Sequence, residues 1–271
     1  MGSDQGEVRD TIISEGPGRG GPGNWGQGEG GSQRAKVRIA ATADVHCTKG
    51  SSGRIEALFG SVHERADVLV LCGDLTDHGT QDEAVLLARE LTHVRIPVVA
   101  VLGNHDHEAG TPEKVADTLS EAGVQVLDGE AVEVNGVGFA GVKGFLGGFG
   151  RGTLGFWGET AVKAFVQAAI DEALKLEHAL AHLQTDQRVV LMHYAPIDTT
   201  CEGERKEIYP YLGCSRLEEP LMRAPVDVVF HGHAHKGSLT GQTAQGIPVF
   251  NVAMPLLLGS GSEVPYMLYE L

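Results

Sequence analysis

Long hydrophobic runs are missing from this sequence of 271 residues. No apolar stretch approaches the roughly 20 residues that a helix needs to span a bilayer. The first residues also lack the charged and then apolar pattern of a secretory signal. We therefore expect a soluble, cytoplasmic protein with no membrane partner. The hydrophobic content of 42% is still enough to fill a substantial globular core.

Basic residues are also scarce, because 21 Lys and Arg stand against 36 Asp and Glu and give a formal charge of −15. This balance disfavours extensive, sequence-independent binding to nucleic acid or anionic lipid, and it favours a small substrate as the partner. A local patch of Lys143, Arg151, Arg205 and Lys206 keeps a nuclease among the alternatives. The sequence leaves the oligomeric state open.

Cysteine is rare as well, with four residues in the chain. Cys47 adjoins a candidate metal ligand, and Cys72 lies inside an apolar run directly before Gly73. These positions suit a disulfide framework poorly. We predict that Cys72 serves as a small core side chain.

The first 35 residues differ in composition from the rest of the chain. Residues 16–32 are mostly glycine and hold almost no aliphatic side chains, so they cannot bury enough surface to offset the entropy of ordering. We predict a disordered, glycine-rich tail over residues 1–35 and a catalytic domain over residues 36–271. The match of Gly21, Gly23 and Gly26 to G-x-G-x-x-G has no strand before it and no helix after it, which excludes a dinucleotide site there.

From Lys36 onward, short apolar runs alternate with amphipathic stretches. The runs predict strands at Val37–Thr42, Val68–Cys72 and Val98–Leu102, and the apolar spacing between them predicts helices at Ile55–Ala66 and Asp82–His93. Nearly continuous apolar strands are typical of a sheet that is covered on both faces, with functional loops at the carboxyl ends of the strands.

The second half of the chain predicts a further, mixed sheet packed against the first. Two more helices are expected, at Thr111–Ala122 and Glu159–Leu183. The expected strands are Val124–Leu127, Ala131–Val134, Val137–Val142, Arg188–Met192, Val226–Phe230, Pro248–Val252 and Tyr266–Glu270. The glycine-rich stretch Gly141–Gly158 is read either as a mobile loop near a site or as an irregular structural connection.

Metal-binding side chains follow the apolar runs. A carboxylate and an imidazole two residues apart, such as Asp44 and His46, point to the same side of an extended chain and can reach one cation. A carboxylate such as that of Asp74 has two oxygens and can bridge two ions about 3.5–4 Å apart. The candidate ligands are Asp44, His46, Asp74, Asn104, His193, His233 and His235.

This set mixes carboxylate and amide oxygens with four imidazoles. Mg²⁺ and Ca²⁺ prefer shells made of oxygen alone, whereas a nitrogen and oxygen set suits transition metals. We therefore predict two divalent ions chosen from Mn, Fe, Zn, Co and Ni. A single His or Asp at the end of a strand is more often a cap or a turn former, but seven in ordered spacing favour a metal centre.

The motifs D-x-H, G-D-x-x-D, G-N-H-D, an isolated His and G-H-x-H occur here in that order, and they resemble the calcineurin-like metallophosphoesterase superfamily over about Arg38–Leu271. The resemblance implies an α/β fold, a four-layer αββα sandwich of two mixed sheets with a dinuclear site at the strand-end loops. It also implies that Asp74 is shared between two metal positions. The other ligands would be Asp44, His46 and His235 at one position, and Asn104, His193 and His233 at the other.

Two further residues receive catalytic roles from the resemblance. His105 would assist the leaving group, and Asp77 would orient His105. The chemistry supports this assignment, because two cations lower the pKa of a bridging water, and the resulting hydroxide can attack phosphorus. A protonated His105 could then donate to the departing oxygen, and pairing with Asp77 would favour the charged imidazole.

The motif form is closest to bacterial hydrolases of cyclic nucleotides and small phosphodiesters. His78 stands where the protein phosphatase branch has Arg, and Asp106 stands where that branch has Glu. A diester carries one negative charge and so needs less help from an arginine. Tyr194 departs from the small-phosphodiester pattern, because those relatives often have a second His there.

The alternatives on the same site are a phosphomonoesterase, a nucleotide pyrophosphatase and a nuclease, and a non-catalytic binding scaffold is a remote one. For His78, His107, His231 and Asp106, we expect structural hydrogen bonds or contact with the substrate.

Overall fold

The computed structural model describes residues 36–271, together with the backbone of Ile12 and Ile13. The predicted tail, residues 1–35, lies outside the described residues except for these two. Their backbone forms strand β1 (Ile12–Ile13), which pairs in parallel with β12 (Met267–Glu270). Within the described part of the chain, no helix is both long and apolar enough to cross a membrane.

The first sheet has six strands in the order β1-β12-β2-β3-β4-β5. Strands β2 to β5 run parallel to one another, and β12 lies antiparallel to β2. The bounds of the parallel strands are β2 Arg38–Thr42, β3 Val68–Cys72, β4 Val98–Val101 and β5 Gln125–Val126. The strands predicted from apolar runs are therefore present, with ends that differ by one or two residues.

The second sheet also has six strands, in the order β10-β11-β9-β8-β7-β6. Its four central strands are parallel, and both edge strands are antiparallel to their neighbours. The bounds are β6 Ala131–Val134, β7 Val137–Gly141, β8 Gln187–Leu191, β9 Val228–His231, β10 Thr240–Gln242 and β11 Pro248–Asn251.

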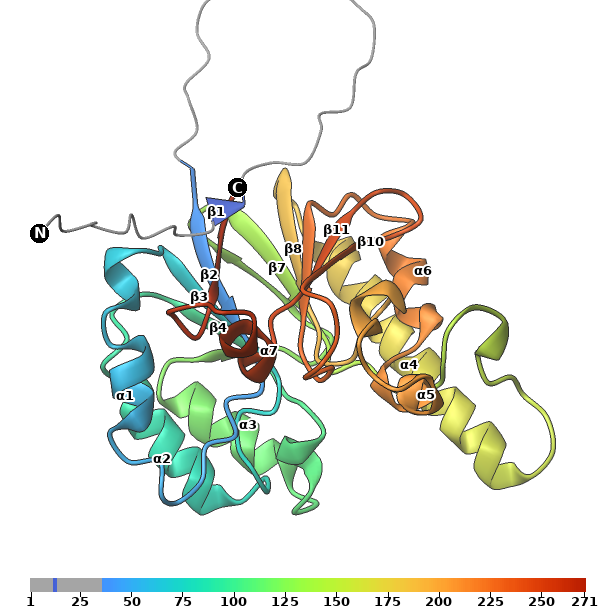
Figure 1. Ribbon diagram of the computed structural model, residues 1–271, viewed down its shortest axis with the longest axis horizontal. Helices are drawn as coiled ribbons and strands as arrows, with labels where there is room; N and C mark the ends of the chain where they lie inside the picture. Colours follow the sequence, from blue (N-terminus) through green and yellow to red (C-terminus); the bar gives the residue numbers. More distant parts are fainter. Residues whose placement is uncertain (1–11, 14–35) are drawn as a thin grey trace, which may run out of the picture.

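Helices cover the outer face of each sheet, and the two sheets face each other (Figure 1). The helices on the first sheet are α1 Arg54–Phe59, α2 Gln81–Leu91 and α3 Pro112–Glu121. On the second sheet lie α4 Thr160–His182 and α6 Glu218–Leu221, and two short helices, α5 Tyr209–Leu212 and α7 Met254–Gly259, lie near the strand ends. The predicted helix Ile55–Ala66 is shorter than expected, because a 3₁₀ turn at Val62–Glu64 follows its end at Phe59.

The core between the sheets is built from side chains of both. Val70 on β3 and Phe139 on β7 belong to one buried cluster. Leu69 and Leu71 point the other way from β3 and pack against the helices of the first sheet. Because successive side chains of a strand face opposite sides, a nearly continuous apolar strand needs a partner layer on each side. The predicted four-layer αββα sandwich is therefore confirmed.

Candidate metal centre

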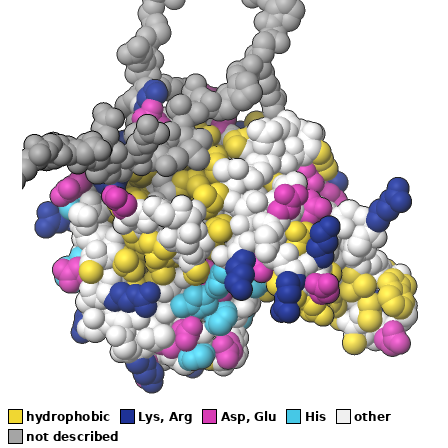
Figure 2. Space-filling model, in the orientation of Figure 1, with side chains coloured by type: hydrophobic (Ala, Val, Ile, Leu, Met, Phe, Trp, Pro, Cys, Tyr) yellow, Lys and Arg dark blue, Asp and Glu magenta, His cyan; other side chains and the backbone are white. Residues whose placement is uncertain are grey.

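The predicted ligands meet at one edge of the molecule, where the central strands of both sheets end. Asp44 and His46 follow β2, Asp74 follows β3 and Asn104 follows β4. His193 follows β8, and the pair formed by His233 and His235 follows β9. Figure 2 shows the resulting patch of His side chains, with acidic and basic side chains at its rim. All seven predicted ligands therefore come from loops at the carboxyl ends of strands.

Backbone strain marks the same positions. Five non-glycine residues of the described chain have positive φ, and four of them are predicted ligands: Asp44 (59°), His46 (46°), Asp74 (50°) and His233 (70°). A left-handed conformation costs a residue with a side chain on the order of 1–3 kcal/mol. Such strain persists where surrounding contacts hold it, and it commonly occurs at functional sites. Four of the seven predicted ligands therefore stand at strained backbone positions.

Asp74 lies between the two halves of the centre. Its Oδ1 is 3.3 Å from His193 Nε2, and its Oδ2 is 3.9 Å from His46 Nε2. Ligand atoms gather in three overlapping sets, which are Asp44 with His46 and His235, Asp74 with His46 and His105, and Asp74 with His193 and His233. In each set the ligand atoms lie within 4.8 Å of one another. The two oxygens of one carboxylate thus face two separate sets of donors.

Hydrogen bonds fix which nitrogen each histidine offers. His193 Nδ1 donates to the Cys72 carbonyl at 2.9 Å, so Nε2 faces Asp74 and also lies 3.0 Å from Asn104 Oδ1. His233 Nε2 donates to the Tyr211 carbonyl at 3.0 Å, which leaves Nδ1 for a metal ion. A hydrogen bond of this kind holds the ring in place and sets the tautomer of a metal-binding histidine.

The buried carboxylates are held in their charged form. Burial alone would raise the pKa of Asp44, but a hydrogen bond with His235 (3.0 Å) and the charges of nearby imidazoles outweigh it and lower that pKa. Burial opposes ionisation at Asp74 too, yet the charge and hydrogen bond of His193 depress its pKa far below the usual range. Two buried anions beside imidazoles that can exchange a proton for a metal ion fit two cations well.

Close approach of the backbone explains the glycines of the motifs. A Cβ on Gly103 would lie 2.1 Å from Asp74 Oδ1, and one on Gly232 would lie 2.5 Å from Asp44 Oδ2. Both distances are far below van der Waals contact. Side chains at these positions would displace the carboxylates, so these glycines allow the backbone to approach the ligands closely.

His105 lies at the edge of the centre, at the start of the 3₁₀ turn η2 (His105–His107). Its Nε2 is 4.0 Å from Asp74 Oδ2, and its ring is 4.6 Å from that of His46. Its Nδ1 donates to the backbone carbonyl of Asp77 at 2.6 Å. The expected contact with Asp77 is present, but it is made by the main chain and not by the carboxylate. The Asp77 carboxylate lies instead 3.2 Å from His46 Nδ1 and 3.3 Å from His78 Nε2.

Asp106 is fully buried and accepts four hydrogen bonds. Its oxygens receive the backbone N–H groups of Leu75 (3.1 Å), Thr76 (2.8 Å) and Gly103 (2.8 Å), and the Thr76 hydroxyl (2.6 Å). This carboxylate therefore ties the loop that carries Asp74 to the loop that carries Asn104. The sequence predicted structural hydrogen bonding or substrate contact here, and the structure shows the former.

The other flanking histidines have distinct surroundings. His231 is fully buried, its Nε2 lies 2.8 Å from the Thr200 hydroxyl, and burial lowers its pKa to about 4. It is a structural residue. His78 is exposed and pairs with Asp77 and Glu108, which lies 3.4 Å from its Nδ1. Its position leaves it open to solvent at the rim.

The glycine-rich stretch after β7 is tied to the segment that supports His233. Gly147 N donates to the Pro210 carbonyl at 2.9 Å, and Gly148 N donates to the Gly213 carbonyl at 2.9 Å. Helix α5 holds the exposed side chain of Tyr211. The first part of this stretch is therefore fixed to the segment whose Tyr211 carbonyl accepts from His233.

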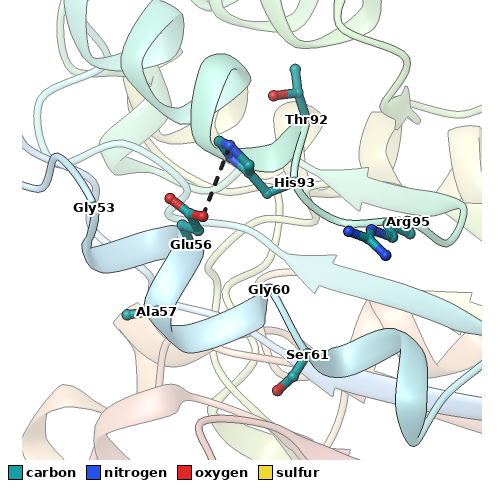
Figure 3. A pocket seen from close by; sticks show the side chains of 8 residues that line it. All are labelled: Gly53, Glu56, Ala57, Gly60, Ser61, Thr92, His93 and Arg95. Carbon is teal, nitrogen blue, oxygen red and sulfur yellow. Dashed lines mark ion pairs between the residues drawn. The ribbon is translucent and has the colours of Figure 1, made fainter.

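A separate pocket lies between α1 and the end of α2, and Figure 3 shows its lining. It includes Thr92 and Arg95, and the imidazole of His93 lies 3.9 Å from the Glu56 carboxylate. None of the predicted site residues lines it. The predicted metal ligands therefore cluster elsewhere on the molecule.

Comparison with known sequences agrees with the motif order. The model of the family described as calcineurin-like phosphoesterase matches residues 37–237. An uncharacterised metallophosphoesterase of Aquifex aeolicus is 35% identical over 104 residues. That match covers 37% of this chain and 39% of the relative, so it spans well under half of either protein.

Comparison with solved structures agrees with the fold. The phosphopantetheinyl hydrolase of Mycobacterium tuberculosis superposes with a TM-score of 0.64 at 16% sequence identity. The match covers 88% of this chain and 96% of that one. At this level of identity, the likeness shows a shared fold and does not extend to the substrate.

Proposed function

We propose that this chain, which belongs to the calcineurin-like phosphoesterase family, is a metal-dependent hydrolase of phosphate esters and acts mainly on small phosphodiesters. The observation that carries the proposal is the position of Asp74, whose two oxygens face separate sets of metal donors. The proposed metal ligands are Asp44, His46, Asp74, Asn104, His193, His233 and His235. The mixed oxygen and nitrogen donors suit two divalent ions from among Mn, Fe, Zn, Co and Ni.

When bound, the two ions would supply a water of lowered pKa as the nucleophile and would neutralise charge on the phosphate. The chain's own residues then orient the reaction. Asp74 holds the two halves of the centre together, and Asp106 fixes the loops on which Asp74 and Asn104 stand. His105 is placed to give a proton to the departing oxygen, because its Nδ1 is occupied by the Asp77 carbonyl and its Nε2 is directed towards the centre.

The preference for diesters is supported by charge. Among residues 36–271, no arginine hydrogen-bonds or pairs with any of the proposed ligands, and the position after Asp77 holds His78. A monoester carries nearly two negative charges, which an arginine would help to bind in a bidentate manner. A diester carries one. A phosphomonoesterase remains the second candidate on the same donors.

A paired assay tests the proposal. The full chain is stripped of metal, reloaded with Mn, Fe, Zn, Co or Ni, and offered bis(p-nitrophenyl) phosphate and p-nitrophenyl phosphate. We expect turnover with at least one metal and a higher kcat/KM for the diester. A higher kcat/KM for the monoester would assign the site to the second candidate, and undiminished turnover without metal would exclude both.

A further inference from the structure

Two histidines stand about one helical turn apart at the end of α4. His178 and His182 are four positions apart, and α4 ends at His182. Residues with this spacing lie on the same face of a helix, so the two side chains are neighbours on its surface. Both are exposed, and their ring centres are 4.3 Å apart. The two imidazoles therefore form a pair that is open to solvent.

A hydrogen bond sets the tautomer of one ring in the pair. His182 Nδ1 donates to the backbone carbonyl of His178 at 2.8 Å, which leaves His182 Nε2 with its lone pair free. Histidines that bind metals in proteins commonly donate their other ring N–H to a backbone carbonyl in this way. Among the described residues, the His178 ring has no hydrogen-bond or ion-pair partner, so it can offer the second nitrogen.

The separation of the rings suits one shared metal ion. A bond from a histidine nitrogen to Zn²⁺ is about 2.0–2.1 Å long, so two such nitrogens in a tetrahedral site lie about 3.4 Å apart. Ring centres at 4.3 Å can reach this nitrogen separation by side-chain rotation, which is fast for exposed residues.

The spacing of the pair is one that binds zinc in other proteins. Two histidines four positions apart on a helix are the zinc ligands of the motif H-E-x-x-H, whose glutamate acts as a general base. Here the three residues between the histidines are Ala179, Leu180 and Ala181. The pair therefore offers the metal ligands of that motif without its catalytic acid.

Electrostatics favours a cation at this end of the helix. The free carbonyl groups of a last helical turn carry partial negative charge, and His182 is the last residue of α4. The net charge of −15 adds a general attraction for cations. A metal ion that joins the two rings would thus be stabilised by the helix and would in turn hold its last turn together.

The pair is separate from the proposed metal centre. Helix α4 lies on the outer face of the second sheet (Figure 1), and none of the seven proposed ligands belongs to it. After His182 the chain enters β8 at Gln187, and it reaches the proposed ligand His193 only beyond the other end of this strand. The length of β8 therefore separates the pair from the centre.

We propose that His178 and His182 form a further metal site, in which the two imidazoles chelate one transition-metal ion and water completes its coordination. The ions that fit are Cu²⁺, Ni²⁺ and Zn²⁺, because imidazole suits them and the affinity of such a site rises from Mn²⁺ towards Cu²⁺. Mn²⁺ prefers oxygen ligands and leaves this site empty. The site stabilises the end of α4, and it does not depend on the activity of the centre.

The test counts the Ni²⁺ ions bound to the full chain by equilibrium dialysis and elemental mass spectrometry. The variants are His178→Gln, His182→Gln and the double variant, all at exposed positions. The wild type should bind one Ni²⁺ more than the double variant. Each single substitution should weaken binding of this ion at least about tenfold, or about 1.4 kcal/mol, because a chelate needs both rings. The number of bound Mn²⁺ ions should be the same in all four proteins.

A variant with both His63→Gln and His93→Gln is the matched control. It also removes two imidazoles, one from the 3₁₀ turn after α1 and one just after α2, but these two are not neighbours on one helix. It should bind as many Ni²⁺ ions as the wild type. Equal Ni²⁺ binding by the wild type and the His178 and His182 double variant would overturn the site. Single variants that keep the extra ion at wild-type affinity would overturn the chelate, and an extra Mn²⁺ ion lost in the double variant would overturn the choice of metals.

Discussion

His193 Nε2 lies 3.3 Å from Asp74 Oδ1, and neither side chain is exposed to solvent. Burial alone would lower the pKa of His193, but the charge of Asp74 and the contact with it raise that pKa to about 9. The metal-free protein therefore carries a proton at the nitrogen that a metal ion would use. Charge balance in this centre is kept either by that proton or by a cation.

Metal affinity should consequently fall as the pH is lowered. Below about pH 9 the metal-free form of His193 is protonated, so binding at Nε2 must release this proton, and lower pH favours the metal-free state. We expect a loss of up to about tenfold in affinity per pH unit between pH 8 and 6 from this group. Titration calorimetry of Mn²⁺ in two buffers of different ionisation enthalpy measures the proton release. Binding that releases no proton and is independent of pH would contradict this.

Removal of the shared carboxylate should do more damage than removal of a terminal one. Asp74 faces both donor sets, whereas the side chain of Asp44 belongs to the set with His46 and His235. Asp74→Asn should therefore reduce the content of both metal positions, and Asp44→Asn should mainly reduce one. Metal content by mass spectrometry, with turnover on the aryl diester, measures this. Equal losses in the two variants would argue against a shared role for Asp74.

His105 should be needed for the leaving group and not for the metal. His105→Ala should keep its metal content and lose roughly 10²–10⁴-fold in rate on an alkyl ester, whose leaving group needs a proton. The loss on a p-nitrophenyl ester should be much smaller. His105 also lies close enough to His46 and Asp74 to form a third cluster of donors with them. Loss of metal in this variant would make His105 a ligand instead of an acid.

Asp77→Asn should behave differently from His105→Ala. The contact with His105 comes from the Asp77 carbonyl, which this substitution keeps, while the carboxylate faces His46 Nδ1 at 3.2 Å. We expect weaker metal binding at the position that includes His46 and an unchanged ratio of alkyl to aryl ester rates. A selective loss on the alkyl ester would show that the carboxylate acts on His105 after all.

Asp106→Asn should loosen two ligand loops at once. The substituted amide group replaces an acceptor with a donor, so at least one of the N–H groups of Leu75, Thr76 and Gly103 loses its partner. A buried donor without a partner costs about 1–3 kcal/mol. The melting temperature should fall by several degrees and metal affinity should fall with it. Excess Mn²⁺ should restore part of the turnover, which a global loss of folding alone would not allow.

The sequence by itself determined the layered fold and the set of residues that we propose as ligands. The strands β2, β3 and β4 are short apolar runs that need cover on both faces, and each ends in a polar motif. Their order along the chain, read together with the resemblance to a known superfamily, was enough to place Asp44, Asp74 and Asn104 on adjacent strands. Periodicity and spacing are local properties, so they can be read from a single sequence.

Other features were decided only by the tertiary structure. The sequence assigned the Asp77 carboxylate to His105, but the fold gives that contact to the backbone and turns the carboxylate to His46. Which group of Asp77 contacts His105 depends on the path of the loop after Asp74. Asp74 has a positive φ, which no spacing rule predicts. Likewise, Lys143 and Tyr194 lie far apart in sequence, and hydrogen bonds between the ends of β7 and β8 bring them together. Contacts between distant segments are set by the packing of the whole sheet, and the local sequence does not contain them.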